Sequence, residues 1–376
     1  MTSNRSSRIQ QQIYTRERRG IFRPNEGFDT IAASGGLDTG FIKKVLHPFC
    51  VYDAPAELAS RGEKDEARYP QALHLFHADM GQLVLGRSIY QTADFTGLRS
   101  AFFTHNFIVP AERAADAVKD YPSLLNADFA SSYDIEQGTE LPELERIPAR
   151  AEASRPASPT ALLASLGIDE KMFKQLLFAV MSSVVTRRKV FVALDVAVEE
   201  LSETALQLVG VLYGSLPYAY RRALGFLTFS KEPQSRKGIH LTFVEQGSLR
   251  PNDRNIDKDY TFDLASKRVT NVDIDLGEAA LLELRLEQSG AAGAGGSLLC
   301  LPRADGGGHG RAAAYRDRQL PRVGCIVPDR GRQRFFLYAE SGRRAAFDAR
   351  LLGAGRGCRV EAAAGGAVPR MLPARV

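Results

Sequence analysis

Residues 10–40, QQQIYTRERRGIFRPNEGFDTIAASGGLDTG, set the character of the N-terminal half of this chain. Their apolar positions follow neither the 3.6-residue period of an amphipathic helix nor an alternation long enough for a core strand. We therefore predict a short strand, a charged bend at residues 16–19, and a loop that re-enters the fold at Phe28 and Ile31. Irregular segments with polar side chains often carry binding residues, so we expect binding residues in this stretch.

Three apolar segments further along are typical of β-strands. They cover residues 72–78, 82–90 and 101–109 and are rich in Leu, Val, Phe and Ile. Gly81, between the first two segments, permits the positive φ of a tight hairpin turn. The pattern predicts an antiparallel β-meander, followed by a short helix over residues 110–121 that starts at a proline.

A second domain is predicted to begin at residue 158, after a polar linker with two prolines at 145–157. Ser158 and Asp169 are good N-caps for two successive helices. Later helices alternate with short apolar segments at residues 190–194, 225–229, 239–244 and 260–264. The predicted fold class is therefore α+β, with an antiparallel β-meander domain at 8–145 and a mixed α/β domain at 158–285.

The composition changes abruptly near residue 290. Residues 290–376 contain 17 alanines, 16 glycines and 15 arginines, and no lysine or asparagine. Few aliphatic positions recur at a regular period, so we predict a largely unstructured, low-complexity tail with isolated strands at 323–327 and 335–338. A flexible extension and translation of a shifted reading frame both explain this bias, and reading the coding DNA in the other two frames distinguishes them.

The tail also accounts for the basic character of the chain. The whole sequence has a formal net charge of +5, of which the tail's 15 arginines and 6 carboxylates contribute +9. Positions 1–289, with 34 basic and 38 acidic residues, therefore carry −4. Nucleic-acid binding is not predicted from such a distribution. The longest nearly apolar run is too short to span a bilayer, and no secretory apolar region begins the chain, so we expect a cytoplasmic protein without membrane contact.

Motifs for nucleotide and metal chemistry are weak or missing. The P-loop pattern G-x-x-x-x-G-K-[ST] does not occur, so we do not expect this chain to hydrolyse nucleotides itself. Residues 308–313 fit G-x-G-x-x-A only formally, because no strand precedes them. The four cysteines match no zinc module. His74 and His77 would face opposite sides of a strand, and we predict no metal or cofactor.

His105 has two interpretations. By alternation along its strand it shares a face with Phe103 and Phe107. A histidine on an apolar face is usually a core residue whose ring donates to a backbone carbonyl, and we favour this interpretation. The alternative is that His105 faces a pocket beside residues 90–99, with its pKa set by burial.

Four segments of the sequence carry long patterns: the opening stretch, LVLGRSIYQTADFTGLRSAFFTHNFIV (83–109), LPYAYRRALGFLTF (216–229) and IHLTFVEQGS (239–248). These patterns resemble the bacterial GTPase-associated protein 1 family. The first two segments resemble its N-terminal domain of the second type, and the last two resemble its middle domain. The positions that match the family's pattern are Gln11, Gln12, Tyr14, Gly20, Phe28, Thr30, Ser34, Gly36, Gly86, Tyr90, Phe95, Gly97, Arg99 and His105. The resemblance covers residues 8–285 and does not extend to the tail.

The resemblance implies an adaptor or regulatory protein that contacts a GTPase encoded nearby, in a bacterial conflict (defence) system. The residues we predict for partner binding are Gln12, Tyr14, Arg16, Gly20, Tyr90, Gly97, Arg99 and His105. The alternative is an enzyme of unknown reaction with a pocket built from Tyr14, Arg16, Arg99 and His105, in which His105 and Tyr14 are the candidate catalytic groups. Of the two, the non-enzymatic adaptor is favoured.

Overall fold

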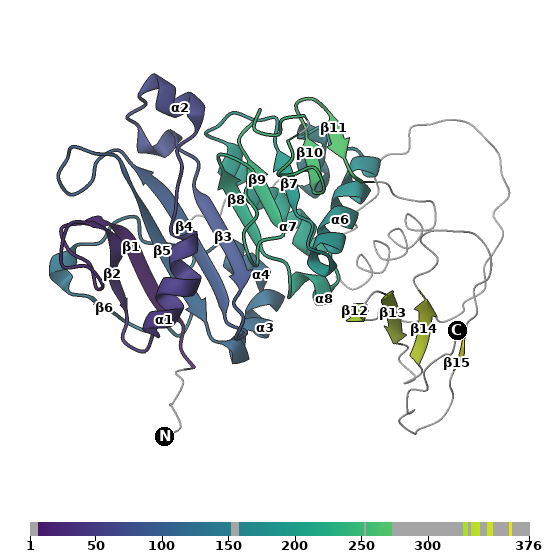
Figure 1. Ribbon diagram of the computed structural model, residues 1–376, viewed down its shortest axis with the longest axis horizontal. Coiled ribbons are helices and arrows are strands. Elements are labelled where there is room, and N and C mark those ends of the chain that lie inside the picture. Colours follow the sequence, from purple (N-terminus) through teal and green to yellow (C-terminus); the bar gives the residue numbers. More distant parts are fainter. Residues whose placement is uncertain are drawn as a thin grey trace. The chain divides into compact units, whose positions relative to one another are not determined.

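A computed structural model (Figure 1) describes residues 7–151, 158–251 and 253–272, together with the backbone of four short strands between 326 and 362. The chain forms two compact units, Met1–Leu301 and Pro302–Val376. Eleven strands of the first unit make one mixed sheet in the order β11-β10-β7-β9-β8-β3-β4-β5-β1-β2-β6. The α+β class predicted from the sequence is therefore confirmed.

The elements of the first unit have the following bounds. The strands are β1 Gln10–Glu17, β2 Gly27–Ser34, β3 Ala72–His77, β4 Leu83–Gln91, β5 Ala101–Val109, β6 Glu140–Leu141, β7 Val190–Ala193, β8 Phe226–Ser230, β9 Leu241–Val244, β10 Tyr260–Asp263 and β11 Arg268–Thr270. The α-helices are α1 Thr39–Phe41, α2 Ala56–Arg61, α3 Ala111–Lys119, α4 Tyr121–Leu125, α5 Pro159–Ser165, α6 Glu170–Val185, α7 Leu201–Ser215 and α8 Tyr218–Arg221. A π-helical turn, η1, covers Ile42–Leu46, and 3-10 turns cover η2 His47–Phe49, η3 Glu66–Arg68 and η4 Ile135–Gln137.

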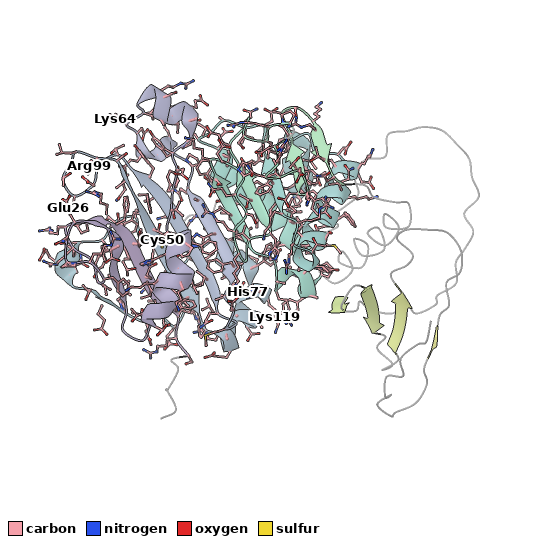
Figure 2. The ribbon with its side chains drawn as sticks, in the orientation of Figure 1. Glu26, Cys50, Lys64, His77, Arg99 and Lys119 are labelled. Carbon is pink, nitrogen blue, oxygen red and sulfur yellow. The ribbon has the colours of Figure 1, made fainter. Side chains whose placement is uncertain are left out.

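The N-terminal half of the sheet is antiparallel. β3, β4 and β5 pair in chain order as predicted, and Gly81 has a φ of 90° in the first hairpin turn. Because β4 runs the length of the meander, the β3–β4 turn and the β4–β5 loop lie at opposite ends of it. Figure 2 shows Glu26 and Arg99 at one end of this half and His77 and Lys119 towards the other.

The opening stretch differs from its prediction. Residues 27–34, expected to be a loop, form a second strand, β2, antiparallel to β1, and β1 in turn pairs with β5. The prediction was wrong because Asp29 interrupts the apolar pattern of β2, and glycine and aspartate are depleted in strands. The backbone partners supplied by β1 decide the conformation instead.

The C-terminal half is largely parallel. β10, β7, β9 and β8 all run in the same direction, and α7 makes the crossover from β7 to β8, as parallel strands require. Ser158 Oγ accepts the N–H of Ala161 at 3.1 Å, and Asp169 Oδ1 accepts that of Met172 at 2.7 Å. Both predicted helix starts are therefore confirmed.

The two halves share one sheet because β3 pairs antiparallel with β8. Gly225 lies at this junction, where an added Cβ would be 1.9 Å from the carbonyl oxygen of Gly238 and 3.0 Å from that of Leu75. Only glycine lets the backbones approach this closely. The ion pair of Lys237 with Asp79, at 2.5 Å, crosses the same boundary. The sequence did not predict this continuity.

In the second unit, the described backbone forms a four-stranded antiparallel sheet in the order β12-β13-β14-β15. The strands are β12 Ile326–Asp329, β13 Arg332–Tyr338, β14 Arg344–Asp348 and β15 Glu361–Ala362. The rest of the predicted tail, with Cys300, Cys325, Cys358 and residues 308–313, lies outside the described residues, as do residues 152–157 of the predicted linker.

Candidate functional site

The sheet divides the predicted site residues between its two faces. Side chains alternate along β5, and the register pairs Ile13 with His105 and Gln12 with Asn106. His105 therefore lies on one face, which we call the His105 face. Gln12 and Tyr14 lie on the other, which we call the Asn106 face.

His105 is a satisfied core residue, as favoured from the sequence. Its Nδ1 accepts the backbone N–H of Ala130 at 3.0 Å, which leaves Nε2 to donate to Gln11 Oε1 at 3.1 Å. The ring thus accepts from the backbone instead of donating to it, which corrects one detail. Burial, with a smaller effect of the Arg87 guanidinium, lowers the pKa of His105 to about 3. The imidazole is neutral at pH 7 and both its nitrogens are used.

The Asn106 face carries a chain of hydrogen bonds that joins four strands to the covering turn η2. Asn106 Nδ2 donates to Gln12 Oε1 at 2.6 Å, and Gln12 Nε2 donates to Thr30 Oγ1 at 2.8 Å. His74 Nε2 lies 2.9 Å from Asn106 Oδ1, and His47 Nε2 lies 2.9 Å from Thr30 Oγ1. Gln12, Thr30 and Asn106 have no exposed surface, so the amides satisfy each other away from water.

The titratable groups of this network are held in their uncharged forms. Asn106 Oδ1 can only accept, so His74 Nε2 carries the proton, and burial lowers the pKa of His74 to about 3. Cys50 lies beside it, with Sγ 3.5 Å from Asn106 Nδ2, and burial raises the pKa of this thiol to about 12. A nucleophilic cysteine needs a thiolate, and a general base needs a pKa near the working pH. Neither group meets these requirements, so the network is structural in character.

Gly86 is required by this network. An added Cβ at Gly86 would lie 1.8 Å from Asn106 Oδ1 and 2.4 Å from His74 Nε2. The hydrogen bond between these side chains passes directly over the Gly86 backbone, so any larger residue would separate them. From the sequence, Gly86 was a position matching the family's pattern, with no role assigned. The structure gives it one, because its cross-strand neighbours His74 and Asn106 bond to each other in the space that a side chain would fill.

Tyr14 lies in an aromatic cluster on the same face. Its ring stacks with Phe28 and Phe102, at centroid distances of 6.2 and 6.1 Å, and meets His47 edge-on at 5.1 Å. Burial is the main cause that raises the pKa of Tyr14 to about 12. The phenol is therefore protonated at neutral pH.

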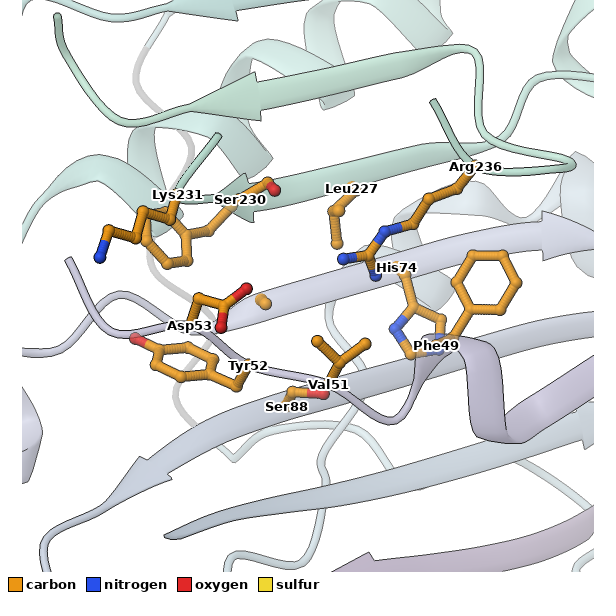
Figure 3. Close-up of a pocket in the computed structure, with 12 residues that line it drawn as sticks. Phe49, Val51, Tyr52, Asp53, His74, Ser88, Leu227, Ser230, Lys231 and Arg236 are labelled. Atoms are coloured by element: carbon orange, nitrogen blue, oxygen red, sulfur yellow. The ribbon is translucent and has the colours of Figure 1, made fainter. Parts of the chain in front are cut away.

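A small pocket lies where the two halves meet (Figure 3). Its charged lining comes from Asp53, Lys231 and Arg236, while His74 and Ser88 border it from the Asn106 face. The cavity volume is about 10 Å³, room for about one water molecule. This space is far too small for a nucleotide or a typical metabolite.

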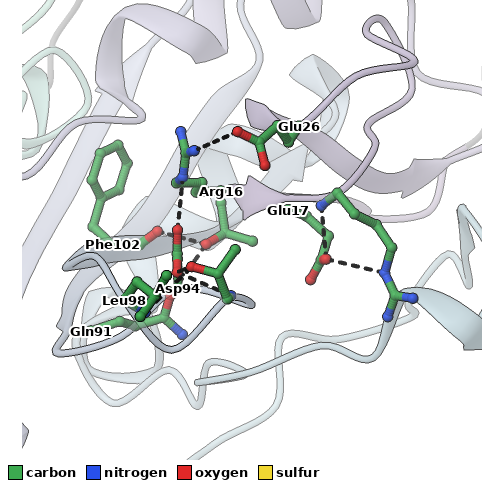
Figure 4. A network of polar contacts seen from close by, with 10 residues as sticks. Arg16, Glu17, Glu26, Gln91, Asp94, Leu98 and Phe102 are labelled. Carbon is green, nitrogen blue, oxygen red and sulfur yellow. Dashed lines mark hydrogen bonds and ion pairs between the residues drawn. The ribbon is translucent and has the colours of Figure 1, made fainter.

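The predicted residues Gly20, Gly97 and Arg99 lie in two loops at one end of the antiparallel half. These are the β1–β2 loop, residues 18–26, and the β4–β5 loop, residues 92–100, which we together call the loop tip. Arg16 joins them: its Nε donates to Asp94 Oδ2 at 2.9 Å, and its Nη2 pairs with Glu26 Oε1 at 3.3 Å (Figure 4). One guanidinium thereby fixes the two loops against each other.

Asp94 also organises its own loop. Its carboxylate accepts both the backbone N–H and the hydroxyl of Thr96, and Thr96 Oγ1 in turn accepts the N–H of Leu98 at 3.3 Å. Gly97 has a φ of 74°, which suits the tight turn. The hydrogen bonds from Thr96 and Arg16 lower the pKa of Asp94 to about 2. The carboxylate is ionised at neutral pH, and it holds the loop in one shape.

Asp29, which sequence reasoning missed, holds the β1–β2 loop. Its Oδ2 accepts the N–H groups of Phe22 and Arg23, both at 2.8 Å, and its Oδ1 accepts that of Thr30 at 2.9 Å. An added Cβ at Gly20 would be 2.4 Å from the Asp29 Cβ, so the loop can pass over this carboxylate only with glycine there. The sequence feature that could have revealed this role is an acidic residue within an otherwise apolar segment.

Comparison with protein families matches the two halves in chain order. The profile of GTPase-associated protein 1, N-terminal domain type 2, matches residues 8–147, and the profile of the GTPase-associated protein 1 middle domain matches residues 162–266. The chain belongs to the GTPase-associated protein 1 family. The predicted resemblance to the N-terminal type 2 domain and the middle domain is therefore confirmed for these residues. No curated protein matches the chain.

This member of the GTPase-associated protein 1 family does not gather the four side chains of the predicted catalytic pocket. Tyr14 and His105 lie on opposite faces of the sheet, Arg16 is engaged with the two loops, and Arg99 is exposed at the loop tip. The ring of Tyr90, a residue predicted for partner binding, stacks on the ring of another tyrosine with 3.9 Å between the ring centroids. Gln12 is buried in the network, whereas Gly20, Gly97 and Arg99 share the loop tip.

Within the described part of this GTPase-associated protein 1 chain, no group of three or more His, Cys, Asp or Glu residues is placed to hold a metal ion. None of the described helices has the length and apolar character needed to cross a membrane.

Proposed function

We propose that this protein is an adaptor that binds a GTPase and regulates it through protein–protein contact. The observation that carries the proposal is the match of two consecutive GTPase-associated protein 1 domains over residues 8–147 and 162–266. The family name implies association with a GTPase. Because this chain contains no P-loop sequence, the proposal assigns the nucleotide chemistry to the partner. We further propose that this protein is cytoplasmic and that its partner is encoded nearby, in a bacterial conflict (defence) system.

The described geometry favours binding over catalysis. His74 and His105 are buried and neutral: His105 uses both ring nitrogens in hydrogen bonds, and His74 uses its Nε2 in the bond to Asn106. The pocket at the junction has room for about one water molecule. A catalytic site normally offers a cleft with titratable groups near their working pKa. The continuous sheet instead provides a rigid platform that presents loops at its ends.

Co-purification with the neighbouring GTPase tests this function. We expect the full chain to form a complex with that GTPase, loaded with GDP or with a non-hydrolysable GTP analogue. We also expect the complex to alter the rate of phosphate release from GTP. Absence of a complex with either nucleotide form, at micromolar concentrations and low salt, would show that the proposed function is wrong.

A further inference from the structure

We propose that the loop tip is the surface through which this chain docks on its GTPase, and that the partner offers there an apolar hollow bordered by carboxylates. This inference rests on the proposed function and adds the place and chemistry of the contact. Three features of the described residues support it: exposed apolar side chains, a preorganised shape, and positive charge.

Exposed apolar side chains collect at this end of the molecule. Among the described residues, four large hydrophobic side chains are exposed, and three of them belong to the loop tip: Leu98 at 86%, Ile21 at 41% and Phe95 at 40%. The fourth, Met80, lies on the β3–β4 turn at the opposite end of the meander. A single exposed apolar residue has little meaning, but several together, with aromatic and arginine neighbours, match the composition of interface cores.

The loop tip is held in one shape before any partner arrives. The Asp94 side chain is fully shielded from solvent and that of Arg16 is only 15% exposed, so this ion pair loses its hydration on folding. This ion pair braces the β4–β5 loop (Figure 4), and the Leu98 side chain of that loop is exposed to solvent. Preorganisation removes the ordering cost that a flexible loop would incur on binding. The shape therefore suits a specific contact.

The charge of the loop tip differs from that of the body around it. Residues 18–26 and 92–100 contain four arginines and two carboxylates, whereas positions 1–289 as a whole carry −4. Arg16 is neutralised by its carboxylate partners, but Arg99 is exposed and its side chain makes no hydrogen bond or ion pair within the described residues. Charge complementarity at an interface steers association, so the partner surface is expected to be acidic.

The test uses full-length variants and the purified GTPase encoded nearby, with binding measured by calorimetry and by association kinetics. We expect Leu98→Asp to weaken binding by about 30-fold or more, the effect of a hot-spot residue. Arg99→Glu should slow association and reduce its dependence on salt. Met80→Asp is the matched control, since it adds the same charge at an exposed apolar position of the other end, and it should bind as the wild type does. All three should keep the wild-type circular dichroism spectrum.

The outcomes distinguish failure of the proposed docking surface from failure of the proposed function. If the wild type binds and Leu98→Asp binds equally well, the docking surface is wrong while the proposed function stands. If the wild type does not bind in either nucleotide state, both are wrong. If Leu98→Asp leaves GTPase binding intact but converts a dimer into a monomer in sedimentation experiments, the loop tip holds a second copy of this chain, and the docking proposal is overturned.

Discussion

Replacement of Gly86 by alanine would show how far the network on the Asn106 face stabilises the N-terminal half. The new Cβ would lie 1.8 Å from Asn106 Oδ1 and 2.4 Å from His74 Nε2. Both neighbours are themselves buried, with 0% and 1% of their surfaces exposed. Neither side chain can withdraw without breaking the hydrogen bond between them, and movement of Asn106 also strains its bond to Gln12.

The magnitude follows from the groups left without partners. Two hydrogen bonds are disturbed, and each buried polar group that loses its partner costs about 1–3 kcal/mol. Alanine recovers about 0.5–1 kcal/mol because it loses less backbone freedom than glycine on folding. The free energy of unfolding of Gly86→Ala should therefore be lower than that of the wild type by about 1–5 kcal/mol.

Urea unfolding followed by far-ultraviolet circular dichroism measures this difference, since the chain contains no tryptophan for fluorescence. Gly210→Ala in α7 is the matched control: its Cβ would meet only Leu125 Cδ1, at 3.5 Å, an ordinary contact. Helix propensity predicts a gain of about 0.5–1 kcal/mol there. A Gly86→Ala protein as stable as the wild type would refute the reasoning.

A double-mutant cycle sharpens the same prediction. Asn106→Ala removes Oδ1, the atom that the new Cβ would approach most closely, and frees space into which His74 can shift, so the effects of Gly86→Ala and Asn106→Ala should not add. We expect the double variant to be more stable than the sum of the two single effects indicates. Strict additivity would mean that Gly86→Ala acts through a different contact.

The remaining predictions concern pH, thiol reactivity and the continuity of the sheet. Burial lowers the pKa of His74 to about 3. Between pH 6.5 and 3 the unfolded state therefore binds a proton at His74 that the folded state does not bind. The free energy of unfolding is thus highest above pH 6.5 and falls as the pH drops. His74→Gln should lower the slope of the unfolding free energy against pH by up to about 1.4 kcal/mol per pH unit, as measured by urea titrations at pH 7, 6 and 5. An unchanged slope would contradict a neutral, buried His74. In a variant whose other three cysteines are serines, Cys50 should react with a thiol reagent only in urea, because it is buried with a pKa raised to about 12; rapid labelling of the native protein would count against its burial. Cleavage at a protease site inserted at 152–157 should leave the halves together on size exclusion, because β3 pairs with β8, and separate elution would show that this pairing is weak.

Some features of this protein follow from local sequence alone. Three kinds of feature were predictable: the hairpin turn at Gly81, the N-caps Ser158 and Asp169, and the strands of the meander. Turn preferences, helix capping and the two-residue alternation of side chains in a strand each depend on only a few neighbouring residues. Strand alternation also predicted that His105 belongs to a core. The change of composition near residue 290 lies beyond residue 266, where the family profiles end.

Only the tertiary structure decided the pairings between distant segments. β2 is a strand because β1 supplies its backbone partners, and its Asp29 is satisfied by loop N–H groups that no local pattern reveals. Gln12 meets Asn106 across 94 residues of sequence, and β3 meets β8 across about 150. Such contacts depend on the packing of the whole sheet, since no short-range preference specifies which strands become neighbours. For the same reason, the sequence named the residues of the opening stretch but not the faces they occupy: Gln12 and Tyr14 became part of a buried structural face, while Arg16 became the brace of an exposed tip.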